Sequence, residues 1–357
     1  MRDLRYPFLR EAFLNALETS GSVSAETGWE PIHLKIESSD LNIFMPLYLK
    51  HHSMGEYVFD YSWANAYHQN GLDYYPKLVT AIPFTPSTGD RIRSDSDLDE
   101  GHCKDLFSEV MLIAEETGAS SWHILFPNEL QRNLLINLDF LQRSAVQYHW
   151  ININYESFEH YLASMTSRKR KMIKRERRHI LDQDIDVDIL DGNEITQAMW
   201  SFFYRLYERT YAKRNGTRGY LTSRFFSEIA QTMPEQIAMS VATKNSQPIA
   251  CALYLYDDNT LYGRYWGSIG EYQFLHFELC YYQGIEFAIQ KGLRRYDAGA
   301  QGEQKLVRGF QPIKTHSLHW IKQPEFREAI ERYLKQESKA VNHHIEQSKE
   351  LLPFKRF

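Results

Sequence analysis

Hydrophobic and polar positions alternate in several short stretches of the N-terminal half of the chain, which predicts β-strands. The expected strands are residues 31–37, 41–49, 56–60, 121–126 and 146–152. Apolar residues at helical spacing predict two helices, over residues 104–118 and 128–140. The first of these helices should end at Gly118, because glycine is common at helix ends.

The C-terminal half repeats this order of elements. Strands are expected over 237–243, 249–256, 261–267, 294–300 and 316–321, with a helix over 276–291 between the third and the fourth. Phe140 is followed nine residues later by a His-Trp pair, and so is Phe310, at a constant offset of 170. The shared order and the constant offset indicate an internal duplication.

Strand–strand–strand–helix–strand–helix–strand is the core order of the GNAT acyltransferase fold. The predicted fold class is therefore α+β, with two tandem GNAT-like domains that each contain a mixed sheet. We expect an N-terminal domain over 1–152 and a C-terminal domain over 153–324 that carries the active site. An amphipathic helix over 325–357 follows them.

Composition limits the classes of function. A length of 357 residues suits two cores, and three cysteines without metal-binding spacing argue against a disulfide framework or a zinc site. The formal net charge of −5 implies no overall attraction to nucleic acid. No apolar stretch is long enough to span a membrane, and the charged N-terminus does not look like a signal peptide, so we expect a cytoplasmic protein without bound metal.

The segment GAQGEQKLVRGF, residues 299–310, is the strongest candidate for chemistry. It follows a predicted strand, where open sheets place ligands. Its expected donor-binding residues are Gly299, Gln301 and Gly302, and its expected catalytic residues are Glu303, Lys305 and Arg308. The corresponding stretch of the first repeat, 126–135, has no glycine and no matching lysine. A solvated turn is the alternative interpretation.

The predicted helix that begins near residue 275 contributes further candidates. Glu278 and Tyr282 are four residues apart, and Glu278 and Tyr281 three, so they should share one helix face. Glu278 or Glu303 would deprotonate the amine, and a tyrosine would protonate the leaving group. Alternatively, Glu278 stabilises the helix start and the tyrosines belong to the core. His276 is a further donor-binding candidate, although a structural role is the more common one for such a histidine.

Residues 167–179, SRKRKMIKRERRH, hold eight lysine and arginine residues and one glutamate. One interpretation is a phosphate-binding surface for RNA or a nucleotide. The other is a solvated helix balanced by the acidic segment 181–194.

Five motifs of the chain are similar to those of a known family: YYPKL (74–78), IPFTPSTGDR (82–91), SRKRKMIKRERR (167–178), LHFELCYYQG (275–284) and GAQGEQKLVRGF (299–310). In these the chain resembles the FemAB-like group of N-acyltransferases, a branch of the GNAT superfamily related to the enzymes that add amino acids to peptidoglycan precursors. The resemblance implies tandem GNAT-like domains and transfer to an amine. It leaves the donor open between acyl-CoA and aminoacyl-tRNA. The phosphate loop of the CoA users is absent from 267–276, which weakens the CoA assignment.

These observations favour an N-acyltransferase in which the amine attacks the donor directly, with Lys305 and Arg308 holding the donor phosphate or the oxyanion. The expected partners are the acyl donor, a small amine or peptide acceptor and possibly tRNA. The alternative is a non-catalytic GNAT-fold protein that uses the basic helix 168–178 to hold RNA or a nucleotide.

Overall fold

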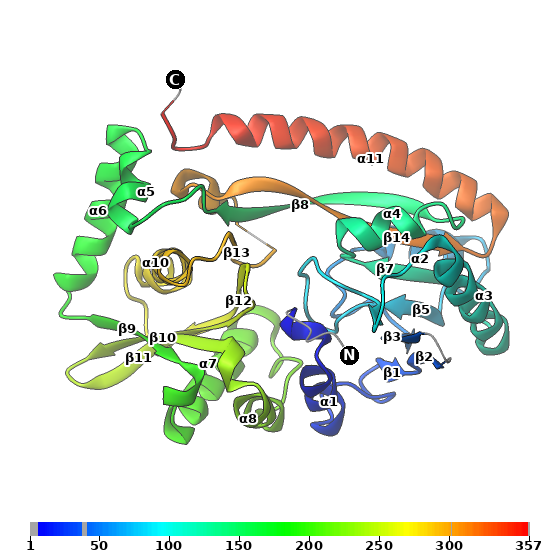
Figure 1. Cartoon of the computed structure of the whole chain (residues 1–357), viewed down its shortest axis with the longest axis horizontal. Coiled ribbons are helices and arrows are strands. Elements are labelled where there is room, and N and C mark those ends of the chain that lie inside the picture. Colours follow the sequence, from blue (N-terminus) through cyan, green and yellow to red (C-terminus); the bar gives the residue numbers. More distant parts are fainter. Residues whose placement is uncertain (1–5, 38–40, 301, 356–357) are drawn as a thin grey trace. The chain divides into compact units, whose positions relative to one another are not determined.

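A computed structural model describes residues 6–37, 41–300 and 302–355. The chain divides into two compact units (Figure 1). The N-terminal unit comprises Met1–Ala145 and Lys314–His344, and the C-terminal unit comprises Val146–Ile313 and Ile345–Phe357. The segment Lys314–His344 thus groups with the N-terminal residues, which differs from the domain ranges expected from the sequence.

Within the described residues, the N-terminal unit contains five helices and most of a sixth, the long helix α11. They are η1 (Pro7–Leu9), α1 (Glu11–Thr19), α2 (Tyr61–Gln69), α3 (Glu100–Thr117), α4 (Glu129–Leu135) and α11 (Pro324–Glu350). The strand order of its larger sheet is β1 (Glu30–Pro31), β4 (Tyr48–Lys50), β5 (Lys77–Thr80), β7 (Ser121–Leu125) and β14 (Gln311–Ile321). A small sheet consists of β2 (Leu34–Glu37), β3 (Asn42–Met45) and β6 (Arg93–Ser94).

The C-terminal unit is built on one sheet with helices on both faces. Its strand order is β8 (Leu141–Ile151), β13 (Arg295–Asp297), β12 (Thr260–Ser268), β11 (Gln247–Tyr256), β10 (Ile237–Lys244) and β9 (Asp186–Asp191). Its helices are α5 (Phe158–Ala163), α6 (Ser167–Leu181), η2 (Gly192–Glu194), α7 (Gln197–Asn215), α8 (Ser223–Thr232), η3 (Pro234–Gln236), α9 (Leu275–Phe277), η4 (Glu278–Tyr282), α10 (Gln283–Gln290) and η5 (Glu303–Arg308). Helix α10 lies on one face of β10–β12 and α7 on the other (Figure 1).

The two units repeat the same strand pattern, but each takes its last strand from the other half of the sequence. In the N-terminal unit β5 pairs in parallel with β7, and β7 pairs antiparallel with β14. In the C-terminal unit β12 pairs in parallel with β13, and β13 pairs antiparallel with β8. The repeated His-Trp pair marks these exchanged strands: His319 lies opposite His123, and His149 lies opposite Asp297. This repeated order supports the duplication inferred from the sequence.

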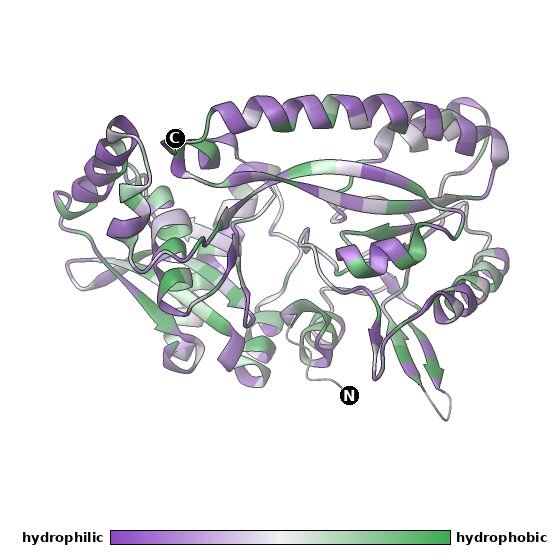
Figure 2. Ribbon diagram, turned by 45° about the horizontal axis from the view of Figure 1, so that its top comes forward, coloured by the Kyte–Doolittle hydropathy of each residue, from purple (hydrophilic) through white to green (hydrophobic). Residues whose placement is uncertain are grey.

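Apolar side chains of both units face the helices that cover the sheets. In the N-terminal unit, Trp122 and Leu318 pack with buried residues of α3, while Trp63 and Tyr67 of α2 pack with Ile330 of α11 on a second cluster. The outward faces of α11 and α6 are hydrophilic (Figure 2). Helix α11 has Ile330, Leu334 and Ile345 buried.

Two local predictions were wrong. Residues 56–60 form a loop instead of a strand, because Tyr57 has a left-handed backbone (φ 61°) and Glu56 and Asp60 both turn inward to bind Lys77. The helix expected over 276–291 is interrupted by the π-helical turn η4. That turn changes which side chains share a face.

Candidate active site of the C-terminal unit

The candidate site lies where β12 and β13 separate. Their parallel pairing joins Tyr262 to Asp297 and ends there, although β12 continues to Ser268. The chain then turns through Gly299 (φ 87°) and Gly302 (φ 110°), conformations that residues with a side chain rarely adopt. Ligands of open α/β sheets commonly bind where neighbouring strands diverge at their carboxyl ends.

Lys305 of η5 lies against this turn and is 1% exposed. Its ammonium donates a hydrogen bond to the Gly299 carbonyl at 2.5 Å. Burial lowers the pKa of Lys305 to about 8, even though Asp297 opposes that shift. No ion pair of Lys305 occurs among the described residues, so its ammonium keeps hydrogen-bonding capacity for a further acceptor.

Asp297 and His149 form a buried pair on neighbouring strands. The His149 Nε2 atom lies 3.5 Å from Asp297 Oδ1 and 3.1 Å from the Gln147 side-chain oxygen. Burial raises the pKa of Asp297, but His149, the Gly299 amide and Lys305 outweigh it, so the pKa is lowered and the carboxylate is charged. Burial lowers the pKa of His149 to about 4. One atom of each side chain, His149 Nδ1 and Asp297 Oδ2, is buried without a partner within the described ranges.

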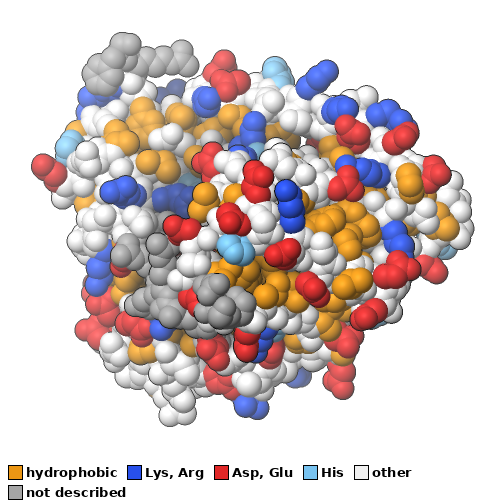
Figure 3. Space-filling model, turned by 45° about the vertical axis from the view of Figure 1, so that its right-hand side comes forward, with side chains coloured by type: hydrophobic (Ala, Val, Ile, Leu, Met, Phe, Trp, Pro, Cys, Tyr) orange, Lys and Arg blue, Asp and Glu red, His pale blue; other side chains and the backbone are white. Residues whose placement is uncertain are grey.

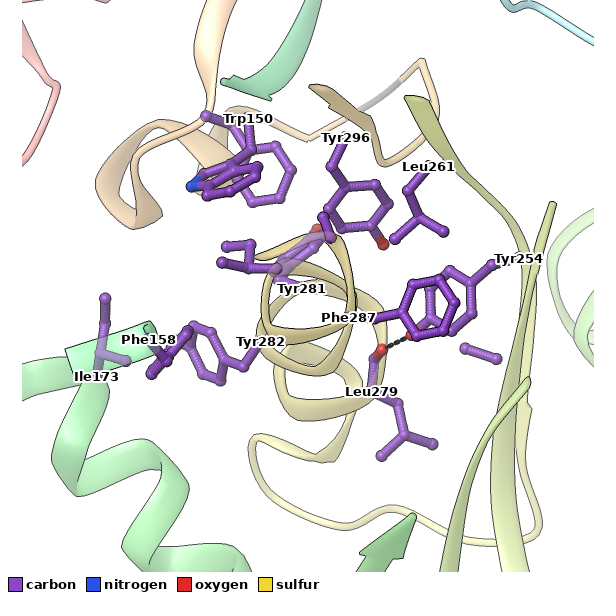
Figure 4. Close-up of a cluster of buried hydrophobic side chains, with 14 of the residues drawn as sticks. Trp150, Phe158, Ile173, Tyr254, Leu261, Leu279, Tyr281, Tyr282, Phe287 and Tyr296 are labelled. Atoms are coloured by element: carbon purple, nitrogen blue, oxygen red, sulfur yellow. Dashed lines mark hydrogen bonds between the residues drawn. The ribbon is translucent and has the colours of Figure 1, made fainter. Parts of the chain in front are cut away.

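The π-helical turn η4 is held by two tyrosine hydroxyls of the sheet. The Tyr254 hydroxyl donates to the Leu279 carbonyl (Figure 4), and the Tyr296 hydroxyl donates to the Cys280 carbonyl at 2.5 Å. Such turns occur frequently at functional sites.

The π turn aligns Glu278 with Gln283 rather than with Tyr282, as the Gln283 amide donates to the Glu278 carboxylate at 2.8 Å. Arg177 of α6 bridges Glu278 (3.0 Å) and Glu286 (2.8 Å). Burial raises the pKa of Glu278, and Arg177 and Gln283 offset that shift only in part. Both interpretations of Glu278, as a base and as a structural carboxylate, remain compatible with these contacts.

Tyr282 and Arg308 both contact Glu176, another residue of α6. The Arg308 guanidinium pairs with Glu176 at 2.8 Å and donates to the Tyr282 oxygen at 2.8 Å, while the Tyr282 hydroxyl donates to Glu176. All three side chains are buried, and the Arg308 guanidinium lies 3.5 Å from the centre of the Phe277 ring. The contacts favour a positioning role for Arg308, because its charge is already matched.

The remaining sequence candidates surround Lys305 or the turn beside it. The Tyr281 ring packs against the half-buried His276, and a Cβ at Gly302 would lie 3.6 Å from the Tyr281 hydroxyl and 3.8 Å from Lys305. Burial, followed by Arg214, lowers the pKa of His276 to about 4. Glu303 is exposed at the start of η5, and Gln301 lies outside the described residues.

Sequence reasoning missed Glu176 and Arg177 and gave Asp297 and His149 no firm role. Two signals were available. Glu176 is the only acid within the basic run, and a lone acid there suggests a buried partner. His149 belongs to the repeated His-Trp pair, which marked equivalent strands without indicating their neighbours.

The N-terminal unit holds a second buried polar cluster, built from the motif YYPKL. The Lys77 ammonium binds Asp60 (2.5 Å), Glu56 (2.9 Å) and the Ser53 hydroxyl (2.8 Å). Burial lowers the pKa of Lys77, but the two carboxylates outweigh it, so the pKa is raised. Lys50 lies 3.9 Å from Glu56 and 3.6 Å from the centre of the Trp29 ring.

A chain of hydrogen bonds continues from this cluster to the exchanged strand. Tyr74 donates to Asp60 at 2.6 Å, and its oxygen lies 3.2 Å from His123 Nε2. The two Nδ1 atoms of His123 and His319 are 2.6 Å apart, and His319 Nε2 lies 2.8 Å from the Ser317 hydroxyl. Burial lowers the pKa of both histidines, to about 3 for His123. Both rings are thus neutral, with one Nδ1 donating to the other.

The described ranges contain no helix long and apolar enough to cross a membrane. Within the same ranges, no three histidine, cysteine or carboxylate side chains cluster as metal ligands would.

Two α/β units, each with a parallel strand pair that continues into an antiparallel strand, define the class of protein: a tandem GNAT-like fold with mixed sheets, as predicted from the sequence. The chain belongs to the FemAB_like family, described as peptidoglycan biosynthesis/recognition, which it matches over residues 2–356. The resemblance seen in the sequence is thereby confirmed. A comparison with curated proteins gave no match.

Among solved structures, FemX is similar in fold, with 12% identity and a TM-score of 0.53 over 89% of this chain and 92% of that one. L-PGS from Bacillus licheniformis gives 11% identity and a TM-score of 0.53 over 91% and 96%. The C-terminal domain of a putative lysylphosphatidylglycerol synthetase from Agrobacterium fabrum gives 9% and 0.52 over 90% and 95%. These likenesses concern the fold, and together with family membership they support a transferase role.

Proposed function

We propose that this protein transfers an acyl or aminoacyl group from an ester or thioester donor to an amine, with Lys305 at the centre of the reaction. The observation that carries the proposal is the state of the Lys305 ammonium. Lys305 is buried beyond the end of β13, and its ammonium donates a hydrogen bond to one carbonyl, that of Gly299. Asp297 Oδ2 and His149 Nδ1 are buried without a partner among the described residues, and the charge of Lys305 helps to lower the pKa of Asp297. Buried polar atoms are nearly always paired in folded proteins, so unpaired ones are candidates for binding a substrate.

In the proposed step, the amine nitrogen attacks the acyl carbon directly. A carbon–nitrogen bond forms, and the carbonyl oxygen becomes an oxyanion that the Lys305 ammonium stabilises. Collapse of the tetrahedral intermediate breaks the carbon–oxygen or carbon–sulfur bond of the donor. A carboxylate accepts the proton that the amine loses, and the leaving oxygen or sulfur takes up a proton.

Glu303 is the favoured base. It opens the same short helix as Lys305, it is exposed, and no ion pair engages it within the described residues. Glu278 stays a candidate, but it must first release Arg177. Arg308 and Tyr282 then act as positioning residues that fix η5 against α6 through Glu176.

The donor is proposed to be an aminoacyl-tRNA or an acyl-CoA, and the acceptor a small amine or peptide. Family membership favours the first donor, and the missing phosphate loop at 267–276 argues in the same direction. Both donors are made in the cytoplasm, so we expect the reaction there.

The test is an assay of donor consumption. The purified full chain is incubated with radiolabelled aminoacyl-tRNA or acetyl-CoA and a panel of amines and short peptides, and products are identified by mass spectrometry. We expect Lys305→Ala to lower the transfer rate about a hundredfold, since removal of one oxyanion donor costs about 2.7 kcal/mol.

Lys291→Ala is the matched control, because Lys291 lies on the same unit, is 40% exposed and forms an ion pair with Asp191 at the surface. It should transfer at the wild-type rate. A Lys305→Ala protein that melts normally and still transfers at the wild-type rate would remove Lys305 from the reaction. No donor consumption by the wild type across the panel would contradict the transferase assignment for these substrates.

A further inference from the structure

The small sheet of the N-terminal unit has one apolar face and one polar face, because successive side chains of a strand point to opposite sides. The apolar face packs on the core that contains Trp122, with Leu34, Ile36, Ile43 and Met45. The other face carries Lys35, Glu37, Asn42, Phe44 and Arg93. The strand register places Lys35 opposite Phe44 and Phe44 opposite Arg93, so these three side chains form a row across the sheet.

Helix α1 presents polar side chains to this polar face. Glu11, Asn15 and Glu18 follow one another at intervals of four and three residues, which places them on one side of the helix, whereas Phe13 and Leu17 are buried. Together with the polar face of the sheet, these three residues line a pocket of about 520 Å³. Sites for small molecules typically have volumes of about 300–1,000 Å³. Two polar surfaces around a hollow bury little apolar area, so the core does not account for this arrangement.

On the helix side of the pocket, Glu18 is held in place by His33. The His33 Nδ1 atom accepts a hydrogen bond from the Leu47 amide at 3.2 Å, so the ring proton is on Nε2, which donates to Glu18 Oε1 at 2.7 Å. The second Glu18 oxygen and the whole Glu11 carboxylate have no partner within the described residues. The helix side therefore offers carboxylate oxygens to a cation.

On the sheet side of the pocket, Arg93 supplies an unmatched positive charge. Its guanidinium lies over the Phe44 ring, 4.7 Å from the ring centre. The Arg93 side chain forms no hydrogen bond or ion pair within the described part of the chain, and its Nε atom is buried. Lys35, at the other end of the same row, is exposed and equally unpaired there. A planar guanidinium binds a carboxylate through two parallel hydrogen bonds, so the sheet side is suited to a carboxylate.

The balance of charge restricts the ligand further. Charges of both signs are common on this protein, and on the face shown in Figure 3 the lysines and arginines are interspersed with carboxylates. The pocket has two cations, Lys35 and Arg93, and four carboxylates, those of Glu11, Glu18, Glu37 and Asp95. This excess of negative charge disfavours phosphate and other multivalent anions and favours a ligand with a net positive charge.

We propose that this pocket binds a free α-amino acid with a cationic side chain. The carboxylate of the ligand binds Arg93, its positive groups bind Glu18 and Glu11, and its apolar stem packs on Phe44. Such a molecule carries both signs of charge and a net positive charge, as the two sides of the pocket require. All of these residues belong to the N-terminal unit, whereas Lys305 belongs to the C-terminal unit. The inference concerns binding and does not depend on the transfer reaction.

The experiment titrates the full chain with L-arginine as the probe and measures binding by calorimetry. Two analogues test the two ends of the ligand: agmatine lacks only the carboxylate of arginine, and L-citrulline replaces the cationic side chain by a neutral one of the same shape. We expect each analogue to bind at least about tenfold more weakly than L-arginine, because each loses a hydrogen-bonded charge. This series uses the wild-type protein and is therefore independent of any effect of mutation on folding.

Two variants test the two sides of the pocket. Arg93→Met keeps the packing on Phe44 without the guanidinium, and Glu18→Gln keeps an oxygen for His33 without the charge. Each should weaken the binding of L-arginine by about tenfold or more. The matched controls are Arg132→Met and Glu129→Gln, which make the same changes on α4 of the same unit, outside the pocket, and should leave binding unchanged.

The proposal is overturned if the wild type shows no saturable binding of L-arginine at millimolar concentrations. Agmatine that binds as tightly as L-arginine would also overturn it, since the ligand carboxylate would then have no receptor. L-glutamate or inorganic phosphate that binds more tightly than L-arginine would identify an anion site instead. Folded Arg93→Met and Glu18→Gln proteins that bind L-arginine like the wild type would place the ligand elsewhere in the molecule.

Discussion

The N-terminal unit buries Lys77 in strand β5 and the C-terminal unit buries Lys305 beyond the end of β13, and these two lysines are in opposite states. Lys77 of the N-terminal unit is surrounded by two carboxylates and a hydroxyl, and its pKa is raised. Lys305 of the C-terminal unit binds one carbonyl, and its pKa is lowered to about 8. The N-terminal lysine is therefore neutralised by its own fold, whereas the C-terminal lysine is not.

The residue pairs on the exchanged strands differ in the same way. In the His123–His319 pair of the N-terminal unit, every ring nitrogen has a hydrogen-bonding neighbour. In the His149–Asp297 pair of the C-terminal unit, one nitrogen and one oxygen have none within the described part of the chain. At these equivalent positions the two N-terminal histidines complete their hydrogen bonds with each other and their neighbours, whereas the C-terminal pair does not. In the adjoining N-terminal cluster, Asp60 Oδ1 and Glu56 Oε1 are also buried without a hydrogen-bond partner among the described residues.

The largest expected effect is on the stability of the N-terminal unit. Lys77→Met should lower the free energy of unfolding by about 3–5 kcal/mol, because Asp60 would remain buried without its ammonium partner and Glu56 would keep only Lys50, at 3.9 Å. Chemical denaturation monitored by circular dichroism measures this loss. Lys305→Met is the comparison, and it should cost much less, since the Lys305 ammonium has no carboxylate partner in hydrogen-bonding contact among the described residues. Equal losses in the two variants would abolish the distinction between the units.

A smaller effect on stability is expected from glycine substitutions in the helix that connects the two strands of each parallel pair. Helix α3 of the N-terminal unit is regular, while its counterpart contains the π turn packed on Tyr296. A Cβ at Gly284 would approach the buried Tyr296 ring to 2.5 Å. Gly284→Ala should therefore destabilise the protein by about 1–3 kcal/mol, as overpacking of a core does, despite the better helix propensity of alanine.

Gly101→Ala in α3 is the matching control. Its Cβ would meet only the exposed Asp99 carboxylate, at 3.2 Å, so stability should stay constant or rise by up to about 1 kcal/mol. Thermal unfolding of both variants measures the contrast. An unchanged melting temperature for Gly284→Ala would mean that Tyr296 does not hold the π turn rigidly.

The order of most strands and helices could be predicted from the sequence, because alternation and helical spacing are local properties. The exchange of β8 and β14 could not, since the His-Trp repeat identifies equivalent strands but not their neighbours. Lys305 and Arg308 looked alike in one motif. They differ because Glu176, which neutralises Arg308, comes from a helix 132 residues away in the chain. The π turn also went unpredicted, as spacing rules assume a regular helix.

The smallest expected effect concerns the pH dependence of transfer, and it tests which state of Lys305 acts. If the ammonium stabilises the oxyanion, the active form is lost as the pH rises through the pKa of about 8. The rate should then fall about tenfold per pH unit above that value, or about 1.4 kcal/mol per unit.

Dividing the wild-type rate by that of Lys305→Ala at each pH cancels the titration of the acceptor amine, because both proteins use the same acceptor. A ratio that rises through pH 8 would instead make the neutral Lys305 amine the base, and a flat ratio would exclude its titration from the reaction. Lys77→Met, which alters a buried lysine of the N-terminal unit, should keep the wild-type shape of the profile at temperatures where it is folded.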